Sequence, residues 1–560
     1  MSPVMENAAK KYQPFPAVGL TDRTWPNKAI IEPPIWCSVD LRDGNQALID
    51  PMGQDRKERM FKLLLDMGFK EIEIGFPSAS QTDFDFARWC IEEGNVPEDV
   101  SLQVLVQCRP ELITRTFEAL DGAHRPIVHF YNSTSELQRR VVFGSDQAGI
   151  RKIATDAAKM IRDMAEDAGG GYRFQYSPES FTGTELEFAL DICNSVTEII
   201  QPTPDNKLIL NLPATVEMST PNIHADQIEW MSRNLDNRKN VILSLHPHND
   251  RGTGIAATEL ALMAGGQRVE GTLFGNGERT GNVDIVTLAL NMYTQGIDPT
   301  LDCSDIERIK SVYEYSNQLR IPERHPYVGE LVYTAFSGSH QDAINKGMKA
   351  LRQSNKEFWE VPYLPIDPQD VGRTYEAIIR INSQSGKGGI AYVMQEDYGI
   401  NLPKKMQAEF SGVIQKITDK EGKELPSERI HLEFLREYIE QPDQPIRFVD
   451  HSTMSDPAGT RTRLITAEIT NDGTSHTIEG RGTGPIDGFV DALSRHLGIE
   501  FSVEDYSEHS LQHGSDAAAI CYMEIESDGK RIFGAGINKN IVAASLEAIV
   551  SAVNRLPATK

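Results

Sequence analysis

VILSLHPHND (241–250) is a short apolar run that ends in a cluster of polar side chains. The five residues from Val241 to Leu245 are typical of a buried strand. His246 and His248 follow at positions i and i+2, which lie on the same face of a strand. Two imidazoles beside a carboxylate suit a divalent metal, although two hydrogen-bonded histidines without a metal would show the same pattern. The rest of the chain has to decide between these readings.

The stretch from residue 35 to about residue 280 alternates short apolar runs with amphipathic segments such as Lys57–Met67 and Lys152–Glu166. Alternating strands and helices indicate parallel strands that are joined by right-handed crossovers. Eight such units in about 250 residues are the number found in a closed (β/α)8 barrel, the TIM barrel. We therefore predict an α/β fold built on such a barrel, with a doubly wound open sheet as the alternative. The eight predicted strands are Ile35–Val39, Glu71–Gly75, Leu102–Val106, Ile127–Phe130, Tyr172–Tyr176, Leu208–Leu212, Val241–Leu245 and Val269–Phe274.

Polar residues follow six of these predicted strands. In a barrel of this type the carboxyl ends of all strands meet at one face, and active sites lie on that face. One such polar segment alone would more often be a helix cap or a loop hydrogen bond, but six at one face predict an active site. The segments are Asp40–Gln46, His129–Asn132, Ser177–Ser180, Pro213–Glu217, His246–Asp250 and Gly275–Asn282.

The composition is that of an acidic globular protein with more than one domain. The 560 residues are too many for one hydrophobic core. The net charge of −25 disfavours nucleic acid and anionic membranes as partners. No apolar run reaches the roughly 18 residues of a membrane span, and the first thirty residues contain neither a signal-peptide core nor more than one arginine. The six cysteines lie far apart and have no C-x-x-C spacing, so we expect reduced thiols in a cytoplasmic protein.

Six motifs of this chain resemble those of the 2-isopropylmalate synthases, which belong to a broader group of metal-dependent acyl-CoA carboligases and lyases. The resemblance covers essentially the whole length. It implies an acyltransferase that condenses acetyl-CoA with the 2-oxo acid 3-methyl-2-oxobutanoate, in the first committed step of leucine biosynthesis. The motifs are LRDGNQALIDPM (41–52), SPESFTGTE (177–185), NLPATVE (211–217), SLHPHNDRGTG (244–254), GNGERTGNVDI (275–285) and SGSHQDAINKG (337–347).

The resemblance carries the metal ligands of the group onto Asp43, His246, His248 and Asn282. Two imidazoles, a carboxylate and an amide oxygen leave open positions on a divalent ion, where a 2-oxo acid can bind and its ketone can be polarised. The family uses Zn²⁺, Mg²⁺ and Mn²⁺, and this mixed set of nitrogen and oxygen ligands does not choose among them.

Several further residues have a role by the same resemblance. Arg42 can direct its guanidinium at the ketone oxygen, where negative charge develops, and a structural ion pair with Asp43 or Glu73 is the alternative. His129, Ser177 and Thr215 are expected to line the pocket for the 2-oxo acid, although Ser177 and Thr215 could equally make only local hydrogen bonds.

The acetyl methyl group must lose a proton before it can attack the ketone, so the reaction needs a base. The candidates are Glu179, at the end of the fifth predicted strand, and His340, which follows the barrel. In the family this histidine reaches the active site of the other subunit, which implies a homodimer. The sequence does not decide between the two candidates.

The chain beyond the barrel changes character. We expect a catalytic domain over residues 1–325, helical linker subdomains over 326–443 with a glycine-rich joint at Gly386–Gly389, and an α+β regulatory domain over 444–560. The last domain contains an internal repeat, because aligning Gly482 with Gly534 and Gly484 with Gly536 gives a constant offset of 52 residues.

Two small repeats can enclose a ligand, and glycine allows the backbone to approach it closely. By the resemblance this domain binds leucine and inhibits the enzyme, with Gly534 and Gly536 as candidate residues. A dimerisation module without a ligand is the alternative.

Other functions fit parts of the sequence. A homocitrate or citramalate synthase would differ only in the size of its oxo-acid pocket. A lyase that cleaves a hydroxyacyl-CoA would use the same barrel but would not need the C-terminal repeat. A silent amino-acid sensor would not need Asp43, His246, His248 and Asn282. The sequence therefore favours the synthase.

Overall fold

The computed structural model describes residues 8–93, 96–335, 337–354, 356–373, 386–421, 425–441, 444–455, 462–511 and 517–556. The chain forms two compact units, which are described one after the other. The first contains residues 1–332 and 368–373, and the second contains residues 333–367 and 374–560.

The first unit is a closed barrel of eight parallel strands in sequence order, in which β8 pairs with β1. This confirms the TIM barrel and excludes the open sheet. The strands are β1 (Ile35–Ser38), β2 (Glu71–Glu73), β3 (Ser101–Gln107), β4 (Ile127–Ser133), β5 (Arg173–Glu179), β6 (Leu208–Ala214), β7 (Val241–Pro247) and β8 (Arg268–Gly271).

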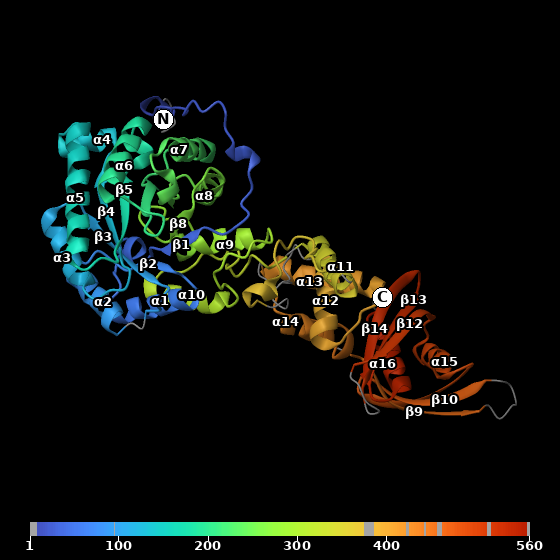
Figure 1. Ribbon diagram of the computed structural model, residues 1–560. Coiled ribbons are helices and arrows are strands. Elements are labelled where there is room, and N and C mark those ends of the chain that lie inside the picture. The colour runs from blue at the N-terminus through green and yellow to red at the C-terminus, as the bar shows by residue number, and fades with distance from the viewer. Residues whose placement is uncertain are drawn as a thin grey trace. The chain divides into compact units, whose positions relative to one another are not determined.

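Helices follow the strands and lie on the outside of the barrel (Figure 1). In α5, for example, the side chain of Asp146 caps the first turn, and Ile150, Ala154 and Ile161 turn toward the strands at helical spacing. The helices of this unit are α1 (Gln54–Asp66), α2 (Gln81–Glu92), α3 (Pro110–Leu120), α4 (Glu136–Gln138), α5 (Gln147–Asp167), α6 (Leu186–Ile200), α7 (Pro221–Asn234), α8 (Gly254–Met263), α9 (Ile285–Tyr293) and α10 (Ile306–Asn317).

The interior of this barrel contains polar and charged side chains. Barrel interiors of this type are filled mainly by branched apolar residues. Here Arg268, which is fully buried, pairs with Glu71 and with Glu270. Buried charges are tolerated only when they are paired and hydrogen-bonded, so this interior is one connected polar network. Its other members are Glu73, Gln103, His129, Gln175, Asn211 and Ser244.

The segment before β1 lies against the outside of the barrel. Arg23 forms an ion pair with Asp226 of α7 at 2.7 Å, and the indole of Trp25 donates to the same carboxylate at 2.8 Å. Trp25 is buried there. These contacts make the N-terminal segment part of the barrel unit.

The second unit begins with helices. They are α11 (Gly338–Gln353), α12 (Gly386–Tyr398), α13 (Lys404–Glu421) and α14 (Ser427–Phe434). The expectation of a glycine-rich joint at Gly386–Gly389 was wrong, because these residues form the first turn of α12.

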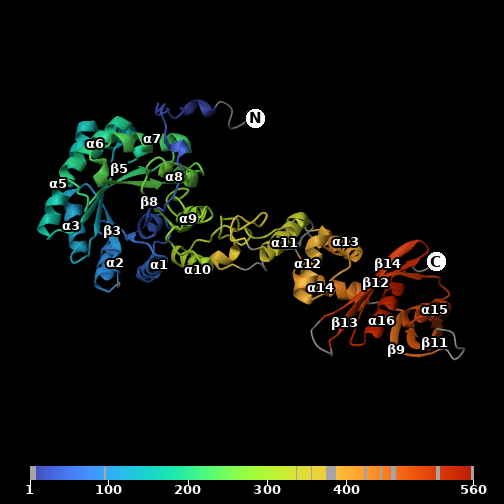
Figure 2. The ribbon, with the colours of Figure 1, turned by 45° about the vertical axis from the view of Figure 1, so that its right-hand side comes forward.

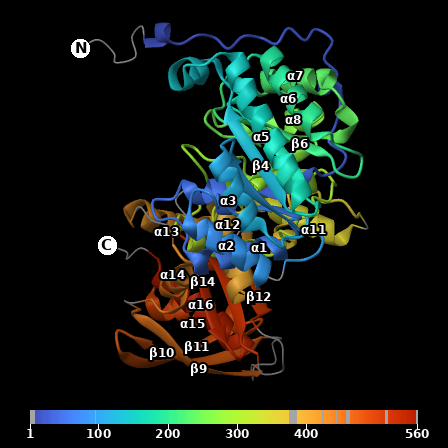
Figure 3. The same cartoon turned by 60° about the vertical axis from the view of Figure 1, so that its left-hand side comes forward.

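Two copies of one β-β-β-α motif follow, which confirms the internal repeat. The first copy is β9 (Ile446–Ser455), β10 (Arg463–Asn471), β11 (Thr474–Gly482) and α15 (Pro485–Leu497). The second is β12 (Ser502–Ser510), β13 (Ala519–Ser527), β14 (Lys530–Asn538) and α16 (Ile541–Asn554). Each copy is an antiparallel three-stranded sheet with its helix, and Figures 2 and 3 show both from two sides.

The predicted offset of 52 residues between the copies was wrong. The strands that correspond begin at residues 463 and 519 and at residues 474 and 530, so the offset is 56. The glycines agree with this register. A Cβ on Gly480 would lie 2.0 Å from the carbonyl oxygen of Gly488, and one on Gly536 would lie 2.2 Å from that of Ala544. Gly480 therefore corresponds to Gly536.

The sheet of the second copy is covered on both faces. Cys521 and Met523 of β13 share a core with α15, α16 and the first sheet. Ile520 and Tyr522, which alternate with them, pack with α12, α13 and α14. Because a strand alternates its faces, β13 joins the linker helices to the repeat domain in one body.

None of the helices in the described part of the chain combines the length and hydrophobicity that a membrane span requires. All six cysteines are unpaired, as predicted.

Candidate active site

A cavity opens at the carboxyl ends of the barrel strands, where the sequence predicts the site. Its volume of about 290 Å³ is close to the lower limit for ligand pockets, roughly 300–1,000 Å³. A small organic acid fits such a space. Phe76, Leu105 and Pro213 supply apolar wall. The predicted residues that the structure brings together in this wall are Arg42, Asp43, His129, Ser177, Glu179, Thr215, His246 and His248.

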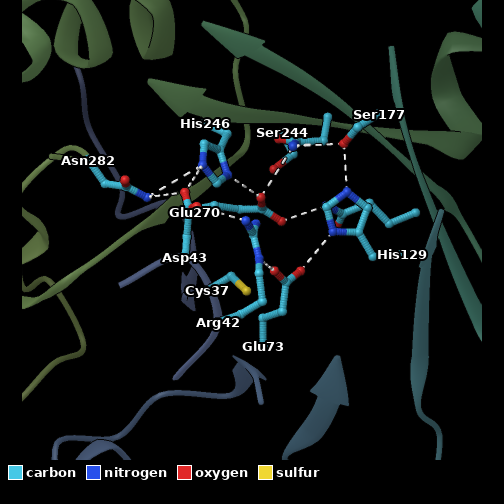
Figure 4. A network of polar contacts seen from close by, with 12 residues as sticks. Cys37, Arg42, Asp43, Glu73, His129, Ser177, Ser244, His246, Glu270 and Asn282 are labelled. Atoms are coloured by element: carbon cyan, nitrogen blue, oxygen red, sulfur yellow. Dashed lines mark hydrogen bonds and ion pairs between the residues drawn. The ribbon is translucent and has the colours of Figure 1, made fainter. Parts of the chain in front are cut away.

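Asp43, His246 and His248 converge on one point of the cavity. Asp43 lies in the short π-helix Asp40–Gly44, which begins two residues after the end of β1, and the two histidines lie at and just after the end of β7. The Oδ2 atom of Asp43 is 3.0 Å from Nε2 of His246 and 3.5 Å from Nε2 of His248. All three side chains are buried, and Figure 4 shows the first two facing each other. One carboxylate oxygen and two imidazole nitrogens are therefore close enough to share one ion.

The other ring nitrogen of each histidine is already engaged. Nδ1 of His246 donates to Glu270 at 2.6 Å, and Nδ1 of His248 donates to the carbonyl oxygen of Ala214 at 3.1 Å. Both acceptors lack a proton to give, so each Nδ1 carries the hydrogen. This leaves both Nε2 atoms free to act as ligands when the rings are neutral, which is the usual arrangement around metal-binding histidines.

Asn282 completes this group from the loop after β8. Its amide nitrogen donates to Asp43 at 2.8 Å, while its Oδ1 atom is buried without a hydrogen-bond partner. A Cβ on Gly277 would lie 2.2 Å from that oxygen, and one on Gly281 would lie 1.8 Å from the carbonyl oxygen of Gly275. Both glycines have positive φ, so the loop folds back onto itself only with glycine at these positions.

Two imidazoles and a carboxylate, with an amide side chain beside them whose oxygen has no partner, are the donor set that a divalent cation satisfies. The residues present therefore fit a divalent metal. The same donors do not select a particular ion.

The charge of Asp43 is stabilised by its surroundings. Burial alone would raise the pKa of this carboxyl group, but the guanidinium of Arg42 and hydrogen bonds from both histidines hold its pKa well below the usual value. For His246, burial lowers the pKa of the imidazole, yet Asp43 and Glu270 together raise it to about 9. A bound metal would take the place of the proton that these carboxylates favour.

Arg42 is held by two carboxylates at the cavity wall. One guanidinium nitrogen is 2.9 Å from Asp43, and Nε forms an ion pair with Glu73. The structural ion pair that the sequence left open therefore exists. Arg42 also lines the cavity, so the pair orients the guanidinium and does not remove it from the site.

Of the three residues expected to bind the 2-oxo acid, His129 and Ser177 are hydrogen-bonded to each other, and Thr215 is held separately. Nε2 of His129 is 2.7 Å from Oγ of Ser177, and this oxygen accepts a hydrogen bond from Asn211 at 3.0 Å. Oγ1 of Thr215 accepts from the backbone of Ser180 at 2.9 Å. Ser177 and Thr215 thus make the local hydrogen bonds that were the alternative reading, and both also line the cavity.

Arg279 ties the loops around Thr215 together. Its guanidinium donates to the carbonyl oxygen of Thr215 at 2.5 Å and to Asp250 at 2.6 Å. Asp250 accepts in addition from the backbone of Glu217 at 2.9 Å. These contacts connect the loops after β6, β7 and β8 and fix Thr215 in the wall.

The two candidate bases lie in different units. Glu179 ends β5 and lines the cavity, where its carboxylate accepts from Ser133. His340 lies on α11 in the second unit, where its ring is 4.2 Å from that of Tyr363. The barrel itself therefore contributes only Glu179 of the two.

Sequence reasoning missed Glu270, and it named Glu73 only as a possible ion-pair partner of Arg42. Glu73, His129 and Glu270 form a second group of possible metal ligands, with ligand atoms within 4.8 Å of one another. Hydrogen bonds from Arg42, Arg268 and three amide side chains already occupy these carboxylates. Figure 4 shows Arg42 and His129 beside Glu73. We read this group as a structural network. The alternation Glu71-Ile72-Glu73-Ile74 is a period-two signal that could have placed two carboxylates on one face of β2.

Gly534 and Gly536 lie in β14, where they face α16. A Cβ on Gly534 would lie 2.2 Å from the carbonyl oxygen of Ala548, so these glycines allow a strand and a helix of the same repeat to pack closely. This packing explains both glycines, and their role toward an effector stays a prediction.

The chain matches known protein families and known proteins over nearly its whole length. Residues 33–312 match the HMGL-like family, residues 330–395 match a domain described as "Alpha-isopropylmalate synthase, post-catalytic domain-like", and residues 424–557 match the "LeuA allosteric (dimerisation) domain". A 2-isopropylmalate synthase of Rhizobium meliloti is 78% identical over 554 residues, which are 99% of both chains. That of Brucella suis is 76% identical over 99% of this chain and 100% of its own, and that of Rhodospirillum rubrum is 57% identical over the same shares. The chain therefore belongs to the 2-isopropylmalate synthase family.

Proposed function

We propose that this enzyme condenses acetyl-CoA with 3-methyl-2-oxobutanoate and hydrolyses the thioester, giving (2S)-2-isopropylmalate and free CoA. One carbon–carbon bond forms between the acetyl methyl carbon and the ketone carbon, and water releases the thiol. The observation that carries this proposal is the convergence of Asp43, His246 and His248 at the cavity, with the amide of Asn282 beside Asp43. The identity of the reaction follows from membership of the 2-isopropylmalate synthase family.

Asp43, His246, His248 and Asn282 would hold a divalent metal, which is Mg²⁺, Zn²⁺ or Mn²⁺. When bound, such an ion polarises the ketone and neutralises negative charge. Arg42 supports the same charge from the protein side, because Asp43 and Glu73 fix its guanidinium at the cavity wall. His129, Ser177 and Thr215 offer hydrogen bonds to the carboxylate of the 2-oxo acid.

The proton of the acetyl methyl group goes to Glu179 or to His340. Glu179 has the better claim within the barrel, because its carboxylate lies in the cavity wall. His340 would act from the second unit, and the family arrangement supplies it from the partner in a homodimer. The domain match at residues 424–557 supports a homodimer.

The same match supports leucine as an allosteric effector of this enzyme, with the C-terminal repeats as its site and Gly534 and Gly536 as candidate residues. We divide the chain accordingly into a catalytic part over residues 1–325, a linker part over 326–443 and a regulatory part over 444–560. The unpaired cysteines support a cytoplasmic location.

The decisive experiment measures thiol release from acetyl-CoA with a panel of 2-oxo acids, with and without added metal. We expect 3-methyl-2-oxobutanoate to have the highest kcat/KM and a chelator to abolish the reaction. The apolar wall of Phe76, Leu105 and Pro213 suits a branched side chain. A higher kcat/KM with pyruvate or 2-oxoglutarate would assign the enzyme to the citramalate or homocitrate synthases instead. Metal-independent turnover would contradict the mechanism.

A further inference from the structure

Gln103 lies in β3 in the barrel interior and is fully buried. It is not one of the described residues that line the cavity. A buried amide inside a barrel needs hydrogen bonds for both of its ends. The groups that form hydrogen bonds with these two ends therefore determine what Gln103 does in the site.

The amide of Gln103 has one possible orientation. Its Oε1 accepts from Arg268 at 2.8 Å, and its Nε2 donates to Glu73 and, at 3.1 Å, to Glu270. An arginine only donates and ionised carboxylates only accept, so exchanging the oxygen and the nitrogen would break all of these hydrogen bonds. Gln103 is therefore a fixed bridge between two carboxylates.

These two carboxylates belong to different halves of the site. Glu270 holds His246, a candidate metal ligand, at 2.6 Å. Glu73 holds Arg42 through an ion pair and His129 at 2.7 Å. We call Glu270 and His246 the metal half of the site, and Glu73, Arg42 and His129 the substrate half. Gln103 thus joins the carboxylates of these two halves.

The two carboxylates would repel each other without the bridge. Both are fully buried, and ligand atoms of Glu73 and Glu270 lie within 4.8 Å of each other. Repulsion between like charges is strong in a buried environment. A buried acceptor that loses a charge-assisted hydrogen bond also moves to regain one. Either movement would carry His246, Arg42 and His129 away from their present positions.

We propose that Gln103 is a positioning residue that holds the metal-binding and substrate-binding halves of the site in one geometry. The proposal rests on the metal-dependent condensation described above. Gln103 touches neither the coordinating atoms of the metal ligands nor the cavity itself. Besides Glu73 and Glu270 it contacts Arg268 and, at 3.4 Å, Nδ1 of His129, so its effect on the site is indirect.

Gln175 provides a matched control. It lies in β5, is fully buried, and donates to the same oxygen of Glu270 at 2.6 Å. In the described structure it makes no hydrogen bond to Glu73, and its own Oε1 has no partner. Gln175→Leu therefore removes a donor from the metal half only, whereas Gln103→Leu removes one from both halves.

The test uses the full-length protein after removal of metal by a chelator. Binding of Mn²⁺ is followed by electron paramagnetic resonance of the free ion, and kcat/KM for 3-methyl-2-oxobutanoate is then measured at saturating Mn²⁺. For Gln103→Leu we expect the Kd for Mn²⁺ to rise about 10-fold or more, as for other outer partners of metal ligands, and kcat/KM to stay about 10-fold below the parent at saturation. For Gln175→Leu we expect the Kd to rise but kcat/KM at saturating Mn²⁺ to return to within about 3-fold of the parent.

An unchanged Kd for Mn²⁺ in Gln103→Leu would overturn the proposal. So would complete recovery of its kcat/KM at saturating Mn²⁺, because the substrate half would then not depend on Gln103. If Gln103→Leu does not fold, Gln103→Glu has the same shape but cannot donate to both carboxylates, and the same two changes are expected. If the parent protein binds no Mn²⁺, the metal site is wrong and this proposal is wrong with it. If the parent protein binds Mn²⁺ and Gln103→Leu binds it equally well, only this proposal is wrong.

Discussion

Replacing His246 with alanine removes one of the two imidazole nitrogens that face Asp43. It also removes the hydrogen bond from Nδ1 to Glu270. Glu270 keeps its ion pair with Arg268 and its hydrogen bonds from Gln175 and Asn211. The variant therefore loses a metal ligand while the charge of the barrel interior stays paired.

The two consequences differ in size. Loss of one charge-assisted hydrogen bond costs about 1–3 kcal/mol, which is smaller than the total stability of a typical domain, about 5–15 kcal/mol. Loss of metal polarisation removes several kcal/mol of transition-state stabilisation. Since about 1.4 kcal/mol is tenfold in rate, three or more powers of ten in kcat/KM should disappear. His246→Ala should be folded and inactive.

The assay is thiol release from acetyl-CoA with saturating 3-methyl-2-oxobutanoate and excess metal, with thermal unfolding measured in parallel. His224→Ala is the control, because His224 is another buried histidine of the barrel unit but is not one of the described residues that line the cavity. The control should turn over at close to the parent rate. Normal turnover by His246→Ala in excess metal would refute the assignment of this histidine as a ligand.

Three further predictions concern other parts of the chain. His340→Ala should lower kcat much more than it raises KM for the oxo acid, and a change in KM alone would make His340 a binding residue. Gly536→Asp and its counterpart Gly480→Asp should each lower stability by about 1–3 kcal/mol in thermal unfolding, because both glycines touch helix backbone; a loss of leucine inhibition in Gly536→Asp alone would support an effector site there. Burial lowers the pKa of His224 to about 4, so only the unfolded chain binds a proton between about pH 4 and pH 6.5, and stability falls as the pH falls. His224→Leu should remove about 2 kcal/mol of the stability lost between about pH 7 and pH 5.

The barrel could be predicted because each strand is a short apolar run followed by a polar turn. Val241–Leu245, for example, lies within β7 as the structure has it. The position of His246 and His248 at the end of such a run placed both at the carboxyl face. Asn282 could be predicted only from the resemblance, because the fold of its loop depends on Gly277 and Gly281 and not on any periodic pattern.

The polar network inside the barrel could not be predicted from the sequence in the same way. Glu270 follows Val269 in a four-residue strand, too short to show alternation, and its partners Gln103 and Gln175 come from distant segments. Single side chains in a strand do not reveal whether their face is an interior or a solvent surface. Only closure of the barrel brings them together.

The predicted offset between the two C-terminal copies was wrong for a different reason. Matching Gly482 with Gly534 aligned glycines by spacing, whereas the structure aligns Gly480 with Gly536 by their contact with the following helix. The shared core of β13 with α12–α14 was also invisible in the sequence. It means that a chain ended near residue 440 exposes apolar helix faces, so such a truncation is a poor test of leucine inhibition.

Anomalous diffraction from crystals grown with Mn²⁺ would show whether Asp43, His246, His248 and Asn282 bind a metal. We expect a strong peak bonded to a carboxylate oxygen of Asp43, to Nε2 of His246 and of His248, and to the Oδ1 atom of Asn282. Ligand distances should be near 2.0–2.3 Å, as is usual for such ions. A peak between Glu73, His129 and Glu270 instead, or no peak beside Asp43 in crystals of active enzyme, would contradict this assignment.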